Sequence, residues 1–207
     1  MKKKLLLFIT SFSLLLPSFI QAQVFDGNAE WTWMNGSPDN LDRGDASAHV
    51  GVPTATTRPP SRWQAVGWTG NDGNLWLFGG EYNNGLSFGT RGNTLNDLWM
   101  YNITTGQWTW VAGTFSATSN AGFGDQGVYG PLNTPGANYL PRSRRGATGG
   151  KDANGVFWVF GGWNKNGTTG ATGHLNDLWS YNITTGMWTW VSGTNGYVTH
   201  GTYGTQG

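Results

Sequence analysis

The sequence predicts an all-β protein made of short antiparallel strands joined by many tight turns. Glycine supplies 34 of the 207 residues, and 13 tryptophans help to raise the aromatic share to 14%. Glycine at this frequency disfavours long helices, whereas large aromatic side chains are enriched in strands. Charged residues make up only 11%, against about 25% in an ordinary domain. A chain this rich in aromatic residues and poor in charge is also unlike a disordered segment.

The first 22 residues have the pattern of a secretory signal peptide. Lysines occupy positions 2–4, a short apolar run covers residues 5–16, and the small residue Ala22 follows. This order of basic, apolar and small residues is typical of a cleaved export signal. The apolar run is short for a membrane anchor, which needs about 20 residues. We therefore expect export to the periplasm, the cell surface or the medium, with no membrane span after signal removal.

Two copies of one repeat follow the signal. Residues 61–80 align with residues 143–162, and residues 95–114 align with residues 175–194. A partial third copy, Glu30–Ser37, matches the end of each unit, and residues 203–207 resemble the start of the connection between the units. Internal repeats of this kind predict a repeat architecture in which each copy is one structural unit.

Each unit predicts four strands in chain order. The first begins near Arg62 or Arg144, and the second is the apolar run at residues 75–78 or 156–160. Asp-Gly or Asn-Gly precedes the second strand, and these pairs favour tight hairpins. The third strand covers residues 97–102 or 177–182, and an Asn-Ile-Thr-Thr-Gly turn leads to the fourth. In the fourth strand, alternating tryptophans (108 and 110, 188 and 190) share one face of the sheet.

These residues together resemble the kelch repeat. The resemblance consists of an arginine, an apolar strand that ends in Gly-Gly, the sequence Asn-Asp-Leu-Trp-x-Tyr-Asn and a spaced tryptophan. In this chain the two sets are Arg62, 79–80, 96–102 and Trp108, then Arg144, 161–162, 176–182 and Trp188. The resemblance implies β-propeller blades, each a four-stranded antiparallel sheet. The period is longer than the usual value of about 50 residues, and the connection at 115–142 holds most of the excess.

The predicted organisation is an incomplete propeller with two full blades. Its parts are the signal peptide 1–22, a segment 23–60 with a lone fourth strand at 30–37, the blade 61–114, the inter-blade loop 115–142, the blade 143–194 and the start of the next loop at 195–207. Propellers close with about 4 to 8 blades. We therefore expect the missing blades to come from a longer chain or from self-association, because open end faces rich in aromatic residues are prone to aggregate. A ring of three copies is the alternative, but a ninth strand in each chain counts against it.

Long connections on a rigid scaffold are where binding residues gather. We expect the connections between second and third strands to emerge on the same face as those between blades. The candidate ligand-binding residues there are Tyr82, Asn83, Asn84, Arg91, Trp163, Asn164, Lys165 and His174. Arg62 and Arg144 are added as possible contacts of an acidic ligand in a central channel. The alternatives are that the loops only pack on one another and that these arginines bond to neighbouring carbonyl groups.

The sequence offers no catalytic constellation. Asp97 and Asp177 occupy equivalent repeat positions, which favours a structural role for each within its own blade. The resemblance extends to galactose-oxidase-like propellers, whose copper site needs a tyrosine–cysteine crosslink, and this chain has no cysteine. No cofactor or metal is therefore predicted. The small net charge of +1 gives no electrostatic footprint for nucleic acid.

We therefore predict a noncatalytic extracytoplasmic binding module whose partner is a carbohydrate or a protein. The alternative is that the chain is the accessory propeller portion of a larger secreted enzyme that acts on carbohydrate, with the catalytic part encoded elsewhere. A fold alone does not decide between these functions.

Overall fold

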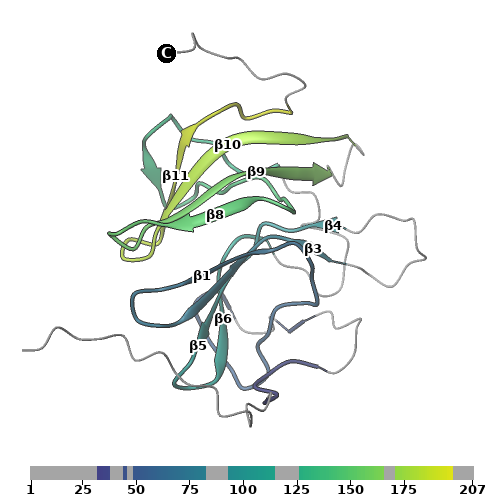
Figure 1. Ribbon diagram of the computed structural model, residues 1–207, viewed down its shortest axis with the longest axis vertical. Coiled ribbons are helices and arrows are strands. Elements are labelled where there is room, and N and C mark those ends of the chain that lie inside the picture. The colour runs from purple at the N-terminus through teal and green to yellow at the C-terminus, as the bar shows by residue number, and fades with distance from the viewer. Residues whose placement is uncertain are drawn as a thin grey trace, which may run out of the picture. The chain divides into compact units, whose positions relative to one another are not determined.

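The computed structural model describes residues 32–37, 44–45, 49–82, 93–114, 126–165 and 171–197, and within these it contains strands and turns but no helix. Figure 1 shows the strands, which belong to one unit, Met34–Gly207. They form antiparallel sheets of four, five and two strands. The all-β prediction is confirmed.

The first sheet has the strand order β1-β2-β5-β6. Its strands are β1 (Val66–Thr69), β2 (Leu75–Phe78), β5 (Leu98–Asn102) and β6 (Gln107–Ala112). The predicted turn between β1 and β2 is confirmed: Gly73 has a φ of +80°, and Asp72 Oδ1 accepts a hydrogen bond from the backbone N–H of Asn74. The Asn-Ile-Thr-Thr-Gly turn is held by Asn102, whose Oδ1 accepts from two backbone N–H groups.

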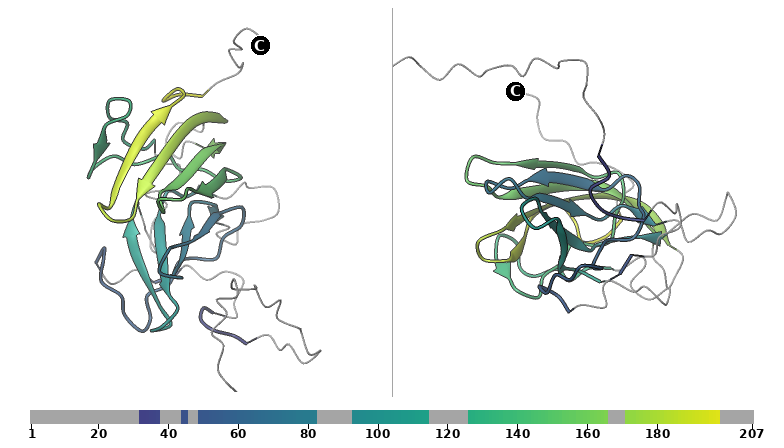
Figure 2. Two further views of the ribbon diagram at one scale, coloured as in Figure 1. Left: turned by 60° about the vertical axis from the view of Figure 1, so that its left-hand side comes forward. Right: turned by 90° about the horizontal axis from the view of Figure 1, so that it is seen from below.

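The second sheet repeats this arrangement in the order β7-β11-β10-β9-β8. Its main strands are β8 (Thr148–Lys151), β9 (Phe157–Lys165), β10 (Thr172–Asn182) and β11 (Met187–Ser192). The short fifth strand, β7 (Pro135–Gly136), comes from the connection between the repeats and pairs with β11. In the first repeat, β3 (Glu81–Tyr82) and β4 (Asn93–Thr94) form a separate two-stranded sheet. Figure 2 shows the twist of both large sheets.

Two predictions need correction, and a third stays untested. The first strand of each repeat starts at Val66 or Thr148, four residues after Arg62 or Arg144 and not near the arginine itself. Backbone with positive φ at Gln64 and Gly146 interrupts the extended conformation between the arginine and the strand. No strand lies within the described residues 32–37; because this segment is expected to complete a different sheet, its strand stays a prediction. The connection at 115–142 is more than a loop, because it contributes β7 to the sheet.

The core lies between the two large sheets and is built from aromatic rings. Trp68 stacks on Phe157 with ring centroids 4.9 Å apart and an interplanar angle of 3°. Phe78 contacts Trp188 at 5.1 Å, and Trp76 contacts Phe157 edge-on at 5.3 Å. Pairs of this size and geometry add to the free energy gained by burying the rings. One face of the first sheet is therefore closed by the opposite face of the second.

Positions that are equivalent in the repeat differ in burial according to this contact. Phe157 is fully buried, but Leu75, its equivalent in the first sheet, is 45% exposed. Phe78 is fully buried, but Phe160, its equivalent in the second sheet, is 51% exposed. The first sheet is thus exposed at Leu75, although Trp99 and Tyr101 on the same face are buried, and the second sheet is exposed at Phe160.

This asymmetry gives a matched stability test. We expect Phe157→Ala to lower the free energy of unfolding by about 3–5 kcal/mol, the usual cost of deleting a buried aromatic ring. Leu75→Ala, at the equivalent position, should cost about 1 kcal/mol or less because its side chain is already half in water. Urea unfolding followed by tryptophan fluorescence measures both values. Equal costs would contradict the assignment of the core to the contact between the sheets.

Candidate functional site

A buried ion pair links the start of the second repeat to its third strand. Arg144 NH1 donates to Asp177 Oδ1 and NH2 donates to Oδ2, both at 2.8 Å. The same guanidinium donates to the carbonyl oxygens of Arg142 and Gly161. Trp179 Nε1 donates to Asp177 Oδ2 at 2.7 Å. The two charged side chains are 1% and 0% exposed, so they need this bidentate pairing to offset the loss of water.

The first repeat contains the same unit. Arg62 donates to Asp97 Oδ1 at 2.7 Å and to Oδ2 at 2.8 Å, and it also donates to the carbonyl oxygen of Gly79. Trp99 Nε1 donates to Asp97 at 2.7 Å. The prediction that Arg62 and Arg144 contact a ligand is therefore corrected, because both guanidinium groups are buried and committed to internal acceptors. The alternative of bonding to neighbouring carbonyl groups agrees with the structure.

The aspartates do serve their own sheets, as expected, but sequence reasoning missed their arginine partners. Asp97 and Asp177 accept charged hydrogen bonds from an arginine in a distant part of the same repeat. The signal was present in the sequence, since each unit repeats the arginine and the aspartate together. A pair of opposite charges preserved between copies in a charge-poor chain is a candidate buried ion pair.

Tyr129 closes this unit in the second repeat. Its hydroxyl group donates to Asp177 Oδ2 at 2.5 Å, and its ring contacts Trp179 at 4.9 Å and Trp190 at 5.1 Å. Burial and the charge of Asp177 raise the pKa of Tyr129 to about 12. Burial alone would raise the pKa of Asp177, but the hydrogen bonds and charge of Arg144 outweigh it and hold that pKa below its usual value. Tyr129 is thus fixed to the scaffold.

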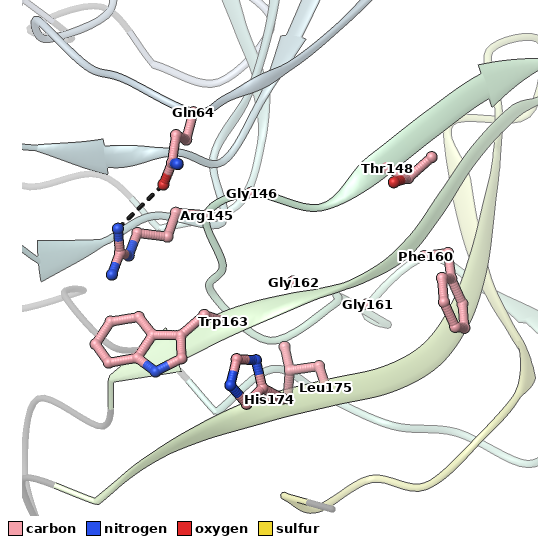
Figure 3. Close-up of a pocket in the computed structure, with 10 residues that line it drawn as sticks. All are labelled: Gln64, Arg145, Gly146, Thr148, Phe160, Gly161, Gly162, Trp163, His174 and Leu175. Carbon is pink, nitrogen blue, oxygen red and sulfur yellow. Dashed lines mark hydrogen bonds between the residues drawn. The ribbon is translucent and has the colours of Figure 1, made fainter. Parts of the chain in front are cut away.

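An open groove of about 430 Å³ lies on the second sheet (Figure 3). Its lining residues come from β8, β9, β10 and the two segments that precede the first strands. They are Gln64, Arg145, Gly146, Thr148, Phe160, Gly161, Gly162, Trp163, His174 and Leu175. Trp163 and His174, both predicted as ligand contacts, are paired across β9 and β10 and are brought together here.

Arg145 forms one end of the groove, and Figure 3 shows it directed towards Gln64. Its guanidinium carbon lies 4.5 Å from the ring centre of Trp163 and 5.2 Å from that of Trp63. Its Nε lies 2.7 Å from Glu81 Oε2, and its NH1 donates to Gln64 Oε1 at 3.0 Å. The groove therefore combines aromatic rings, one cation and the amide of Gln64, which suits contact with polar groups that also have flat apolar surfaces.

The other predicted contacts lie elsewhere. Asn164 is buried, and its Nδ2 donates to Ser143 Oγ at 2.7 Å while its Oδ1 accepts from Tyr197 at 2.5 Å. Tyr82 is 5% exposed. These two residues therefore face the protein interior, in contrast to the prediction, because their strands pack against the neighbouring repeat or loop. Lys165 is half-buried at the end of β9. The remaining three candidates, Asn83, Asn84 and Arg91, lie outside the described residues.

The equivalent position on the first sheet is occupied by polypeptide from the second repeat. The backbone N–H of Gly80 donates to the carbonyl oxygen of Arg144 at 2.8 Å, and the N–H of Arg144 donates to the carbonyl oxygen of Leu95 at 2.9 Å. The hydroxyl groups of Thr94 and Ser143 lie 3.0 Å apart. The main chain of Arg144 is thus hydrogen-bonded to the first repeat, while its side chain is hydrogen-bonded to Asp177 in the second repeat.

Two equivalent glycines distinguish the occupied position from the open one. A Cβ at Gly79, where φ is +64°, would lie 2.8 Å from the carbonyl oxygen of Arg144. At Gly161, where φ is +65°, the nearest atom among the described residues would be the carbonyl oxygen of Leu175 at 3.1 Å. The backbone has the same shape in both places, but no second main chain among the described residues lies against Gly161. The groove is therefore an open copy of a site that binds main chain in the first sheet.

Across the described ranges, no group of three or more His, Asp or Glu side chains is arranged to hold a metal ion. The part of the chain that the structure describes also contains no helix long and apolar enough to cross a bilayer.

Comparisons with known proteins give no family and only distant likenesses to solved structures, of which 74 chains match. No protein-family model matches the sequence, and no curated protein matches it. The solved structure of YjhT is similar over 68% of this chain, with 19% sequence identity and a TM-score of 0.43. The matched region covers 40% of the YjhT chain, so this chain spans less than half of that neighbour.

The buried ion pair predicts the effect of a single substitution. Asp177→Asn should lower the free energy of unfolding at neutral pH by about 3–5 kcal/mol, because it leaves Arg144 buried without its counter-charge. Asp152→Asn is the control, since Asp152 also accepts an indole hydrogen bond, from Trp158, but lies in a turn at the surface. Urea unfolding should give a clearly smaller loss for the control. An equal loss would count against the ion pair.

The same pair predicts a dependence on pH. Because the pKa of Asp177 is lower in the folded protein than in the unfolded chain, its ionised form stabilises the fold above about pH 4. This contribution is lost as the pH falls through the folded-state pKa. Unfolding measured in steps from neutral pH to about pH 2.5 should therefore show a shallower acid loss for Asp177→Asn than for the wild type. Parallel curves would show that Asp177 does not carry this linkage.

Proposed function

We propose that this protein is a noncatalytic, extracytoplasmic binding module whose two large sheets are blades of a kelch-type β-propeller. The proposal is supported by two repeats that carry the kelch pattern and fold as similar antiparallel sheets packed face to face. The signal-like N-terminus supports export. The missing blades would come from more polypeptide or from other copies.

The groove on the second sheet binds an extended polypeptide segment in this proposal. The observation that carries it is the filled equivalent in the first sheet, where Gly80 and Leu95 hold the main chain of Arg144 by two hydrogen bonds. Gly162 and Leu175 occupy the corresponding positions in the groove. Recognition through main-chain hydrogen bonds gives affinity, and neighbouring side chains then give specificity.

A carbohydrate is the second candidate ligand, and one observation favours it. Trp163 and His174 border the groove beside the cation of Arg145. Aromatic planes next to polar groups can stack on the apolar face of a sugar while its hydroxyl groups are hydrogen-bonded. A sugar would contact only Trp163, His174 and Arg145 at the border of the groove. A polypeptide would also bind the main chain of Gly162 and Leu175.

A labelled peptide separates these candidates. The probe is a capped hexapeptide with the sequence of residues 143–148, Ser-Arg-Arg-Gly-Ala-Thr, and fluorescence anisotropy measures its binding. We expect saturable binding, weakened by about tenfold or less when the first arginine of the peptide is N-methylated, because one main-chain hydrogen bond is lost. Trp163→Ala should weaken binding through loss of the ring beside the second arginine of the peptide.

The controls decide the ligand class. Ile103→Ala, an exposed substitution in the turn between β5 and β6, should leave peptide binding unchanged. A glycan array that shows binding lost in Trp163→Ala, without any peptide binding, would replace the polypeptide proposal with the carbohydrate one. Absence of both activities in the folded protein would refute the groove as a binding site.

A further inference from the structure

We infer that the occupant of the groove is a second copy of this chain, docked head to tail through its first sheet. The inference rests on the proposed function, because it names the polypeptide that enters the groove. It also extends the contact from the groove to the whole open face of the second sheet. Three comparisons between equivalent positions of the two repeats support it.

The first comparison concerns the apolar faces. Inside the chain, the face of the first sheet that carries Phe78 meets the face of the second sheet that carries Phe157. The outer faces of the two sheets carry the equivalents of these residues, Phe160 and Leu75, which are 51% and 45% exposed. A second copy could therefore place its Leu75 face against the Phe160 face of the first copy and repeat the internal contact. Each open face thus has a ready complement on the opposite end of the same molecule.

The second comparison concerns the main chain. Arg144 uses its backbone N–H and its carbonyl oxygen to bind Leu95 and Gly80 of the preceding sheet. Arg62 is its equivalent, and within the described part of the chain its backbone N–H and carbonyl oxygen make no backbone hydrogen bond. In a second copy, the backbone N–H of Arg62 would donate to the carbonyl oxygen of Leu175 in the groove. The carbonyl oxygen of Arg62 would accept a hydrogen bond from the N–H of Gly162. Ser61 precedes Arg62 as Ser143 precedes Arg144. The segment of the second copy that enters the groove therefore carries a serine hydroxyl group at the same position.

The third comparison concerns the residue that follows each arginine. Arg145 lies beside Trp63 and forms an ion pair with Glu81 of the preceding sheet. In the docked copy, Trp63 takes the place of Arg145, and Trp163 takes the place of Glu81. An ion pair inside the chain would thus be replaced between copies by two tryptophans next to the Arg145 cation. Trp63 is 51% exposed in the single chain, and aromatic pairs and cation–π contacts both favour this arrangement.

This association is heterologous, since each contact joins two different faces. Heterologous contacts continue from copy to copy until they close into a ring or form an open filament. A symmetric dimer would instead join like faces. The two possibilities respond differently to substitutions at the two ends, which gives a direct test.

Phe160→Glu and Leu75→Glu each place a charge on one open face without disturbing the core. Light scattering after size-exclusion chromatography should find concentration-dependent assemblies for the wild type and monomers for either variant alone. An equal mixture of the variants should form 1:1 dimers and nothing larger, because it contains one intact face of each kind. Leu132→Glu, at a site 49% exposed in the connection that leads to the edge strand β7, should assemble like the wild type. Circular dichroism checks that each variant is folded.

Several outcomes would overturn the inference. A wild type that stays monomeric at high concentration refutes self-docking, and if it still binds the probe peptide, the proposed function survives on its own. A wild type that assembles while the variant mixture remains monomeric indicates like-to-like contact. Assembly that persists in both variants shows that other surfaces are responsible. Dimers in the mixture, together with displacement by a capped peptide of residues 60–65, support the head-to-tail arrangement.

Discussion

The buried pair of Arg144 and Asp177 is the interaction on which the rest of the structure depends. The Arg144 side chain binds its own sheet, and the Arg144 main chain binds the preceding sheet. One residue therefore fixes the fold within a repeat and the contact between repeats. Its environment requires full pairing, since removal of one partner from a buried ion pair leaves an uncompensated charge. The aspartate, the indole of Trp179 and the hydroxyl of Tyr129 supply that pairing.

The glycine pairs make this arrangement sterically possible. At Gly79 a side chain would collide with the incoming carbonyl oxygen of Arg144, and positive φ would add strain. The same backbone occurs at Gly161, where the site is open. A position built to let another main chain approach closely is suited to binding a polypeptide. This feature is the basis for proposing a protein partner for the groove, although Trp163 and His174 border it.

Burial in this protein is decided by neighbouring repeats more than by residue type. Phe78 and Phe160 are the same residue at the same repeat position, but the first is buried and the second is half in water. Repeat proteins are stabilised by contacts between adjacent units, so an end unit keeps an unsatisfied face. The proposed binding and the proposed assembly would both use one feature, the exposed face of the second sheet.

The sequence alone determined the all-β class, the hairpin turns, the apolar second strands and the paired tryptophans of the fourth strands, because these depend on local patterns of glycine, asparagine and alternating side chains. It also favoured structural roles for Asp97 and Asp177. The tertiary structure decided the partners of Arg62 and Arg144, the start of β1 and β8, and the pairing of β7 with β11. It also separated Trp163 and His174, which share a groove, from buried Asn164 and Tyr82. These features depend on contacts between residues far apart in the chain, and a local pattern carries no information about which distant groups will be brought together.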